Sequence, residues 1–324
     1  MAVTAAPPEG AFRVSLDFEL LWGVCDHADR DAWGARLAGA RATVPRLVEA
    51  FVGGGVRATW ATVGLLFAGR RDEVEAWAPP EALRPRYGDP RLSAYPLLPS
   101  LGPDERRDPA VYGASLVRLL AQAPGQEVGS HTFAHYYCLE PGAAPDSFAA
   151  DLSAARTAAG GHGLAMRSLV LPRNQCAPWA IEVARAHGLD RYRGPAPGWA
   201  DRPAARAGQT PLRRAARLLD AHLGRRGPPP PPDAGRAAGD RPASRFLRPA
   251  DGPLRRLHGL HLAAIRREMA AAARAGRDYH LWWHPHNFGA DPEANMAALG
   301  AILSTYAALR DAHGWPSRAM GDDP

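Results

Sequence analysis

The chain has 324 residues, of which 46% are hydrophobic and 22% are charged, a balance typical of a globular protein with a substantial buried core. Its formal net charge is +6, and every basic residue is an arginine, a bias that we attribute to a GC-rich coding sequence. The arginines are spread out and do not alternate with aromatic residues in one patch, which argues against a nucleic-acid-binding protein.

The cysteines and the first residues bear on the cellular compartment. The three cysteines, Cys25, Cys138 and Cys176, form no CxxC motif, which argues against a disulfide framework and for a reducing compartment. The opening residues, MAVTAAPPEGAF, have neither the basic nor the apolar region of a signal peptide, and no run of about 18 apolar residues follows. We therefore predict a cytoplasmic protein without a transmembrane segment.

Strand and helix patterns alternate through the first part of the chain. Runs rich in β-branched and aromatic residues predict strands, and apolar residues at helical spacing that end on glycine predict helices. In chain order the expected elements are a strand at 12–18, a helix at 39–55, a strand at 56–64, helices at 65–77 and 111–123, a strand at 126–132, a helix at 147–160, a strand at 167–175, a helix at 178–188 and a strand at 189–194. The residues at 79–110 are rich in proline and charge, and we expect a surface segment there.

The second part is less regular. Residues 195–253 are rich in Pro, Arg and Gly, with five consecutive prolines at 228–232, and we predict a flexible insertion there. Within it, 212–226 forms a basic amphipathic pattern, either a solvated surface helix or a contact with an anionic membrane surface. Beyond it we expect, in order, a helix at 254–276, a strand at 278–289 and a helix at 292–313.

Repeated strand–helix units predict a parallel sheet or an α/β barrel, in which functional residues gather at the carboxyl ends of the strands. Polar residues follow the predicted strands here: Asp17, Glu19, His131, His135, Arg173, His284 and His286. They are far apart in the sequence but would meet at one end of a barrel. We expect a single domain over 10–315, with disordered tails at 1–9 and 316–324.

The motif GSHTFAHYYC at 129–138 places His131 and His135 four residues apart, a spacing that lets two imidazoles share a metal ion. Two loop histidines without a metal are the alternative. A carboxylate at the end of the first strand, Glu19 or Asp17, would supply the third ligand. Two histidines and one carboxylate leave positions for water and substrate, as in a catalytic site.

The remaining polar residues suggest roles around such a metal. The carboxylate that does not bind metal could act as a general base, and Arg173 could pair with it and keep it ionised. His284 is the preferred proton donor to a leaving group, followed by His286.

Tryptophans near strand ends either stack on sugar rings or fill the core. The residues of this kind are Trp22, Trp60, Trp282 and Trp283. We take Trp22 and Trp283, together with Asn174 and His286, as candidate substrate contacts.

In this order, SLDFEL, GVRATWATVG, EVGSHTFAH, LVLPRNQ and LWWHPH resemble the motifs of the polysaccharide deacetylases of the NodB-homology type, a carbohydrate esterase family. The resemblance covers about residues 12–310, outside the insertion. The first motif departs from the usual pair of adjacent aspartates, because Phe18 separates Asp17 from Glu19, which would define a variant Asp-x-Glu subgroup.

The resemblance implies a distorted (β/α) barrel, usually of seven strands, and a divalent metal, commonly zinc. It also implies that Asp17 is the base, that Glu19, His131 and His135 hold the metal, that Arg173 steadies Asp17, and that His284 is the general acid. The expected reaction removes an N-acetyl group from a sugar, here an intracellular intermediate of surface polysaccharide biosynthesis. Two alternatives stay open: an amide or cyclic-imide hydrolase of the allantoinase-like branch, and a catalytically silent carbohydrate-binding barrel.

Overall fold

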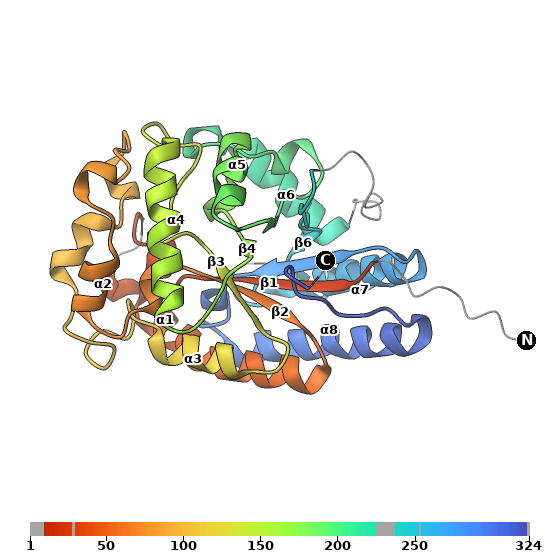
Figure 1. The fold of residues 1–324 in the computed structure, drawn as a ribbon. Coiled ribbons are helices and arrows are strands. Elements are labelled where there is room, and N and C mark those ends of the chain that lie inside the picture. The colour runs from red at the N-terminus through yellow and green to blue at the C-terminus, as the bar shows by residue number, and fades with distance from the viewer. Residues whose placement is uncertain (1–9, 28–29, 225–236, 253, 323–324) are drawn as a thin grey trace, which may run out of the picture.

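The computed structural model describes residues 10–27, 30–224, 237–252 and 254–322. Seven parallel strands form one sheet in the order β5-β4-β3-β2-β1-β7-β6, curled into a half-barrel (Figure 1). The strands are β1 (Phe12–Phe18), β2 (Ala58–Thr62), β3 (Glu127–Ser130), β4 (Ser168–Leu169), β5 (Arg191–Tyr192), β6 (Arg245–Phe246) and β7 (Tyr279–Trp283). The predicted distorted barrel of seven strands in a single α/β domain is confirmed.

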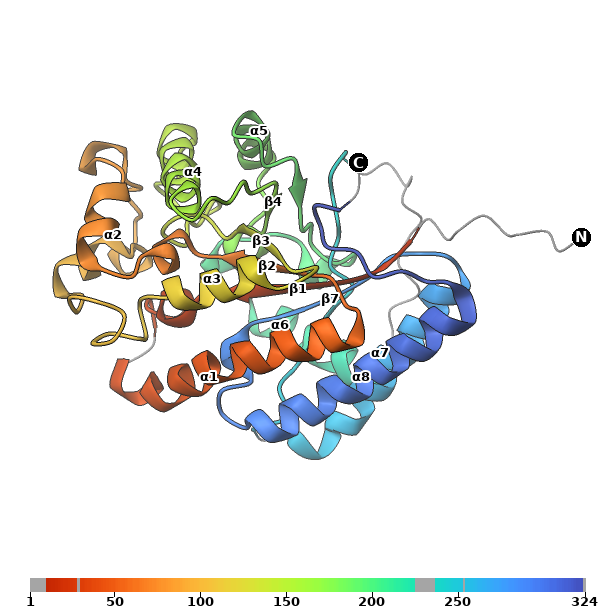
Figure 2. The ribbon, with the colours of Figure 1, turned by 60° about the horizontal axis from the view of Figure 1, so that its bottom comes forward.

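Helices flank the curled sheet, as Figures 1 and 2 show from two directions. They are α1 (Arg30–Gly54), α2 (Arg71–Trp77), α3 (Ala114–Gln122), α4 (Pro145–Gly160), α5 (Pro178–Ala186), α6 (Pro211–Leu223), α7 (His258–Arg274) and α8 (Pro292–His313). Among the described residues, none of these helices combines the length and the apolar character that a membrane crossing needs.

Strand β1 lies in the middle of the sheet and brings the first acidic motif into the interior. All seven of its residues are buried, as expected for a central parallel strand covered on both faces. Its neighbours are β2 and β7, and Leu16 pairs in register with Trp60 on one side and with Trp283 on the other. Because the strands run parallel, the residues that follow β1, β3 and β7 reach the same end of the half-barrel.

The two edge strands, β5 and β6, are joined by the segment that leads into β6. The N–H of Tyr192 donates to the carbonyl of Gly239 at 2.9 Å, the N–H of Arg241 to the carbonyl of Tyr192 at 2.8 Å, and the N–H of Ala243 to the carbonyl of Gly194 at 2.9 Å. Residues 239–246 therefore belong to the barrel, and the prediction that 195–253 lies outside it is wrong for this part. The five prolines at 228–232 lie outside the described residues.

Other predicted boundaries also change. Helix α1 begins at Arg30, nine positions before the expected 39, and the helix expected at 65–77 is a 3-10 turn at Gly64–Phe67 followed by α2. The disordered tail expected at 316–324 is wrong for 316–322, since Met320 is fully buried and Arg13 donates to the carbonyl of Ala319 at 2.8 Å. The expected tail at 1–9 lies outside the described residues.

Candidate metal and catalytic site

The loops after strands β1, β3 and β4 carry an unusual backbone. In the described part of the chain, five non-glycine residues have positive φ: Leu20, Thr132, His135, Arg173 and Asn174. They follow β1, β3 and β4 within a few residues. A left-handed conformation of this kind costs about 1–3 kcal/mol for a non-glycine residue and concentrates at functional sites. The backbone alone therefore marks the end of the half-barrel at which β1, β3 and β4 finish.

Three metal-ligand side chains meet at this end. Glu19 Oε1 lies 2.9 Å from His131 Nε2 and 3.0 Å from His135 Nε2, and all three side chains are buried. We call these residues, together with Asp17 and His284, the acid–histidine cluster. The potential ligand atoms of Glu19, His131 and His135 lie within 4.8 Å of one another, as do those of Asp17, Glu19 and His284, which is close enough for each group of three to share one ion.

The hydrogen bonds of His131 show that this group fits a cation. Its Nδ1 lies 2.8 Å from the carbonyl oxygen of Val170, which can only accept, so Nδ1 carries a proton. In the neutral ring Nε2 then presents a lone pair to the Glu19 carboxylate, and two acceptors at 2.9 Å require a proton or a cation between them. Imidazole and carboxylate donors suit zinc and related divalent ions.

Two residues that we did not single out from the sequence shape this group. A Cβ at Gly23 would lie 1.8 Å from Glu19 Oε2, so only glycine leaves room for the Glu19 side chain. Asp151, buried on α4, accepts from the backbone N–H groups of Phe133 and Ala134 at 2.6 and 3.1 Å, which fixes the loop between the two histidines. Burial raises the pKa of Asp151 to about 7, against the lowering effect of these two donors.

Asp17 is held by Arg193, which the sequence analysis missed. Arg193 follows β5 and is fully buried, and its two terminal nitrogens donate to the two oxygens of Asp17 at 2.6 and 2.8 Å. Its guanidinium lies 4.1 Å from the ring centroid of Trp282. Burial would raise the pKa of Asp17, but the charge of Arg193, with smaller effects of His131 and His284, brings it below its usual value. Arg193 lies near the end of the strand predicted at 189–194, and no local sequence pattern distinguishes it from the other arginines of the chain.

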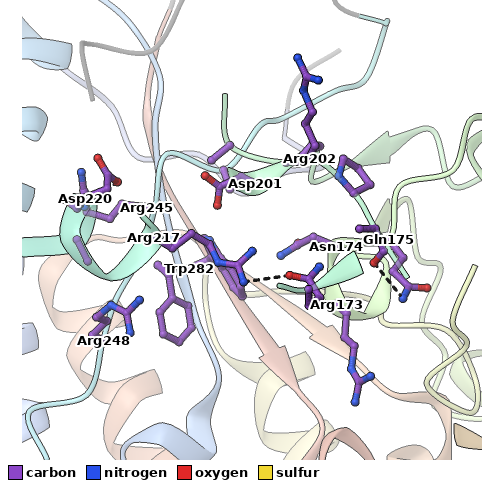
Figure 3. Close-up of a pocket in the computed structure, with 18 of the residues that line it drawn as sticks. Arg173, Asn174, Gln175, Asp201, Arg202, Arg217, Asp220, Arg245, Arg248 and Trp282 are labelled. Atoms are coloured by element: carbon purple, nitrogen blue, oxygen red, sulfur yellow. Dashed lines mark hydrogen bonds and ion pairs between the residues drawn. The ribbon is translucent and has the colours of Figure 1, made fainter. Parts of the chain in front are cut away.

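The expected pairing of Arg173 with Asp17 is wrong. The backbone of Arg173 is left-handed, and its side chain runs away from the middle of the pocket in Figure 3. It donates to Asp26 and lies over the ring of Tyr137, 4.6 Å from the centroid. The neighbouring Asn174 uses its side-chain oxygen to accept from Arg193 at 3.0 Å, and its backbone N–H donates to Leu171.

Two histidines after β7 face the acidic residues. His284 Nε2 lies 3.7 Å from Asp17 Oδ2 and 3.9 Å from Glu19 Oε1, while Nδ1 lies 3.2 Å from the side-chain oxygen of Asn287. His286 stacks on His284 with ring centroids 4.8 Å apart. The buried Nδ1 of His286 has no hydrogen-bond partner among the described residues and lies 3.8 Å from Glu19 Oε2.

Two of the expected substrate contacts are core residues instead. Trp22 is fully buried and donates from Nε1 to the carbonyl of Val111 at 2.8 Å. Trp283 is fully buried and stacks on Phe288 at 5.6 Å. Side chains alternate along β7, so the half-buried Trp282 faces the opposite side from Trp283 and lines the pocket.

Figure 3 shows a cavity of about 380 Å³, and His284 of the acid–histidine cluster is one of the residues that line it. His284 belongs to both, so a ligand in the cavity can reach the cluster. The cavity is bordered by six arginines: Arg173, Arg202, Arg206, Arg217, Arg245 and Arg248. We call it the arginine cavity. Much of its wall comes from residues 201–248, inside the range that we had predicted to be an insertion.

Comparison with known proteins adds the fold relationship. No family model and no curated protein sequence matches the chain. A crystal structure assigned as a polysaccharide deacetylase from Mycobacterium smegmatis superposes with a TM-score of 0.54 at 16% identity, covering 98% of this chain and 91% of the other. This likeness shows that the two proteins share a fold.

Two further structures are more distant. A family 4 carbohydrate esterase from Streptomyces lividans in complex with acetate has a TM-score of 0.43 and 13% identity, covering 96% of this chain and 93% of that one. A CE4 family pseudoenzyme from Bacillus anthracis has a TM-score of 0.45 and 11% identity, covering 96% and 64%.

Proposed function

We propose that the protein is a metal-dependent hydrolase that removes the acetyl group from an N-acetylated sugar, as a variant Asp-x-Glu member of the polysaccharide deacetylases. The observation that carries the proposal is the meeting of Glu19, His131 and His135 on one point beside an arginine-held Asp17. The polysaccharide-deacetylase fold of the similar structure supports it. The proposal includes the biosynthetic setting expected from the sequence, an intracellular intermediate of a surface polysaccharide.

Glu19, His131 and His135 would hold the divalent ion, and zinc fits these donors. The chemistry supplied there by a bound cation is Lewis acidity, which polarises a carbonyl and acidifies water. The unpartnered Nδ1 of His286, 3.8 Å from Glu19, offers one further contact at the same place, to a ligand or to water.

The residues around the ion have separate tasks. Asp17 accepts the proton of the attacking water, and Arg193 orients its carboxylate through two parallel hydrogen bonds. His284, whose Nε2 lies 3.7 Å from Asp17, donates a proton to the leaving amine. The contact of its Nδ1 with Asn287 fixes the orientation of the ring. Water and the amide are thereby converted to acetate and the free amine. The half-buried ring of Trp282 offers a stacking surface for the sugar.

The test is acetate release from a panel of N-acetylated amino sugars, with chelated and zinc-reconstituted protein compared. We expect release that requires the added metal and that is lost in Asp17→Asn while zinc is retained. Asp108→Asn serves as a matched control, because it makes the same acid-to-amide change at a buried aspartate that contacts neither the cluster nor the loop between the two histidines. Zinc-loaded protein that hydrolyses cyclic imides and no acetylated sugar would move the assignment to the allantoinase-like branch.

A further inference from the structure

The arginine cavity contains more positive charge than its structural ion pairs require. Arg245 is neutralised by Glu268, to which it donates at 2.8 and 2.6 Å. Arg173 and Arg206 both donate to Asp26. These three arginines therefore have carboxylate partners. Two acidic residues, Asp201 and Asp220, also line the cavity, and Asp220 lies 3.5 Å from Arg245.

Arg248 is the arginine without a counter-charge. It is half-buried, and in the described part of the chain no carboxylate lies within ion-pair distance of its guanidinium, whose Nε is buried without a hydrogen-bond partner. Burial lowers its pKa, and the charges of Arg217 and Arg245 lower it further. A buried cation among other cations is unfavourable unless an anion joins them.

The backbone of Arg248 is fixed, so its position is built into the fold. Its N–H donates to Nε2 of His261 at 3.1 Å, and the other ring nitrogen of His261 lies 2.9 Å from the carbonyl of Ala221 on α6. Burial lowers the pKa of His261 to about 3, so the ring stays neutral and can accept this bond at ordinary pH.

Arg217 on α6 completes the wall. It donates to the carbonyl of Ala200 and to the side chain of Gln209, both at 3.0 Å, and in Figure 3 it points toward the middle of the pocket. Figure 3 also places it on the same side as Arg248 and Trp282. An aromatic ring beside two guanidinium groups can hold a sugar ring together with an anion next to it.

We propose that the arginine cavity binds a phosphate group of the substrate, so that the enzyme acts on a phosphate or diphosphate ester of an N-acetylated amino sugar. This inference rests on the proposed function, because it places the acetyl group at the acid–histidine cluster and the phosphate between Arg248 and Arg217. A phosphate ester has enough free oxygens to accept from both guanidinium groups at once, whereas a carboxylate is matched by one.

The first experiment measures binding apart from catalysis. Chelator-treated protein is titrated calorimetrically with inorganic pyrophosphate, so that the anion cannot bind through a metal. We expect Arg248→Gln to weaken pyrophosphate binding by about tenfold or more. Arg248→Lys keeps the positive charge but loses the planar guanidinium with its paired N–H donors, and should weaken binding less. Arg256→Gln is the matched control, since Arg256 is exposed and does not line the cavity.

The second experiment compares substrates on zinc-loaded protein: N-acetylglucosamine as its methyl glycoside, its 1-phosphate, its uridine diphosphate and its farnesyl diphosphate. We expect the phosphorylated forms to have a kcat/KM about tenfold or more above the neutral glycoside, and this ratio to fall in Arg248→Gln. The farnesyl form is included because Leu212, Leu219 and Trp199 are 69%, 61% and 53% exposed and belong to the segment 199–221, other residues of which line the cavity. The fastest phosphorylated form identifies the source of the phosphate.

The outcomes separate the two proposals. Arg248-dependent pyrophosphate binding without acetate release from any sugar would support the anion site and contradict the deacetylase assignment. Equal kcat/KM for neutral and phosphorylated sugars, with pyrophosphate binding unchanged in Arg248→Gln and Arg248→Lys, would overturn the anion site and leave the deacetylase assignment standing.

Discussion

The acid–histidine cluster and the arginine cavity lie side by side and share His284, but they differ in how their charges are balanced. In the cluster, Asp17 is paired with Arg193, whereas Glu19 lies 2.9 and 3.0 Å from the two histidines, contacts that a proton or a cation would bridge. In the cavity, Arg248 has no carboxylate partner in the described residues. The charges of the cluster favour a cation and the charge of Arg248 favours an anion, so the two neighbouring regions differ in the ligand that would balance them.

The two regions also differ in how the chain builds them. The cluster comes from short motifs at the ends of β1, β3 and β7, where a buried strand fixes the position of the residue that follows. The cavity comes from 3-10 turns, α6 and the segment around β6, where composition gives little local signal. Variants in the cluster should therefore lose bound metal or catalysis, whereas variants in the cavity should lose affinity for the substrate. The following predictions test that difference.

The largest effect is expected from the ligand side chains. Glu19→Ala and His135→Ala should lose bound zinc and reduce acetate release to background, because each removes one of three ligands. Asp17→Asn should retain zinc and lose about 10²–10⁴ in kcat, as expected for a general base. Zinc content and kcat are measured on the same preparations. If Asp17→Asn loses zinc and Glu19→Ala keeps it, the roles of the two acids are reversed.

A comparison of two arginines tests the corrected pairing. Arg193→Ala leaves the buried Asp17 unpaired and should lower the free energy of unfolding by about 3–5 kcal/mol. Arg173→Ala should cost less, because Arg206 still donates to Asp26 at 3.2 Å. Urea unfolding at pH 7 measures both. An equal loss of unfolding free energy in the two variants would mean that the Asp17–Arg193 pair contributes no more to stability than the Arg173–Asp26 pair.

Acid should destabilise the fold through His280 on β7. Burial, and then the charge of Arg193, lower the pKa of His280 to about 3, whereas the unfolded chain takes up this proton below about pH 6.5. The contribution of His280 is therefore complete above about pH 6.5 and is lost as the pH falls toward 3. The loss at pH 5 is on the order of 2 kcal/mol.

Urea unfolding of the wild type and His280→Gln at pH 7 and pH 5 measures this contribution. The variant should lose less stability between the two pH values than the wild type. The same loss in both proteins would show that His280 does not carry this dependence.

The smallest expected effect on catalysis distinguishes two tryptophans. Trp282→Leu should raise KM for the sugar about three- to tenfold, since the ring lines the cavity. Trp22→Leu should leave KM unchanged and lower stability by about 2–5 kcal/mol, because it opens a void and leaves the carbonyl of Val111 unpaired. Steady-state kinetics measure KM, and thermal unfolding measures the stability of both variants. A KM that rises in Trp22→Leu and not in Trp282→Leu would restore Trp22 as the substrate contact predicted from the sequence.

The sequence predicted most of the fold and the residues of the acid–histidine cluster for a physical reason. A parallel strand such as β1 is a short, recognisable apolar run, and side chains directly after it are positioned by the sheet. Strand β6 was missed because it has two residues, Arg245 and Phe246, in a stretch rich in Pro and Arg. The Asp17–Arg193 pair was missed because it joins residues 176 positions apart. No local pattern shows which arginine closes such a contact.

The tryptophans show a second limit. Trp282 and Trp283 are adjacent and chemically identical, and only their alternation across β7 decides that one faces the cavity and the other the core. A one-residue change in the register of the strand exchanges the two, so the choice requires the structure. The membrane contact considered for 212–226 stays a prediction; α6 carries its first residues, and 225–226 lie outside the described residues.

The most direct test of the central claim is the zinc content of the protein, measured by elemental mass spectrometry after chelation, zinc readdition and removal of free metal. The account predicts about one zinc ion per chain in the wild type and in Arg248→Gln, and almost none in His135→Ala. Zinc-free wild type, or equal zinc in the wild type and His135→Ala, would contradict it.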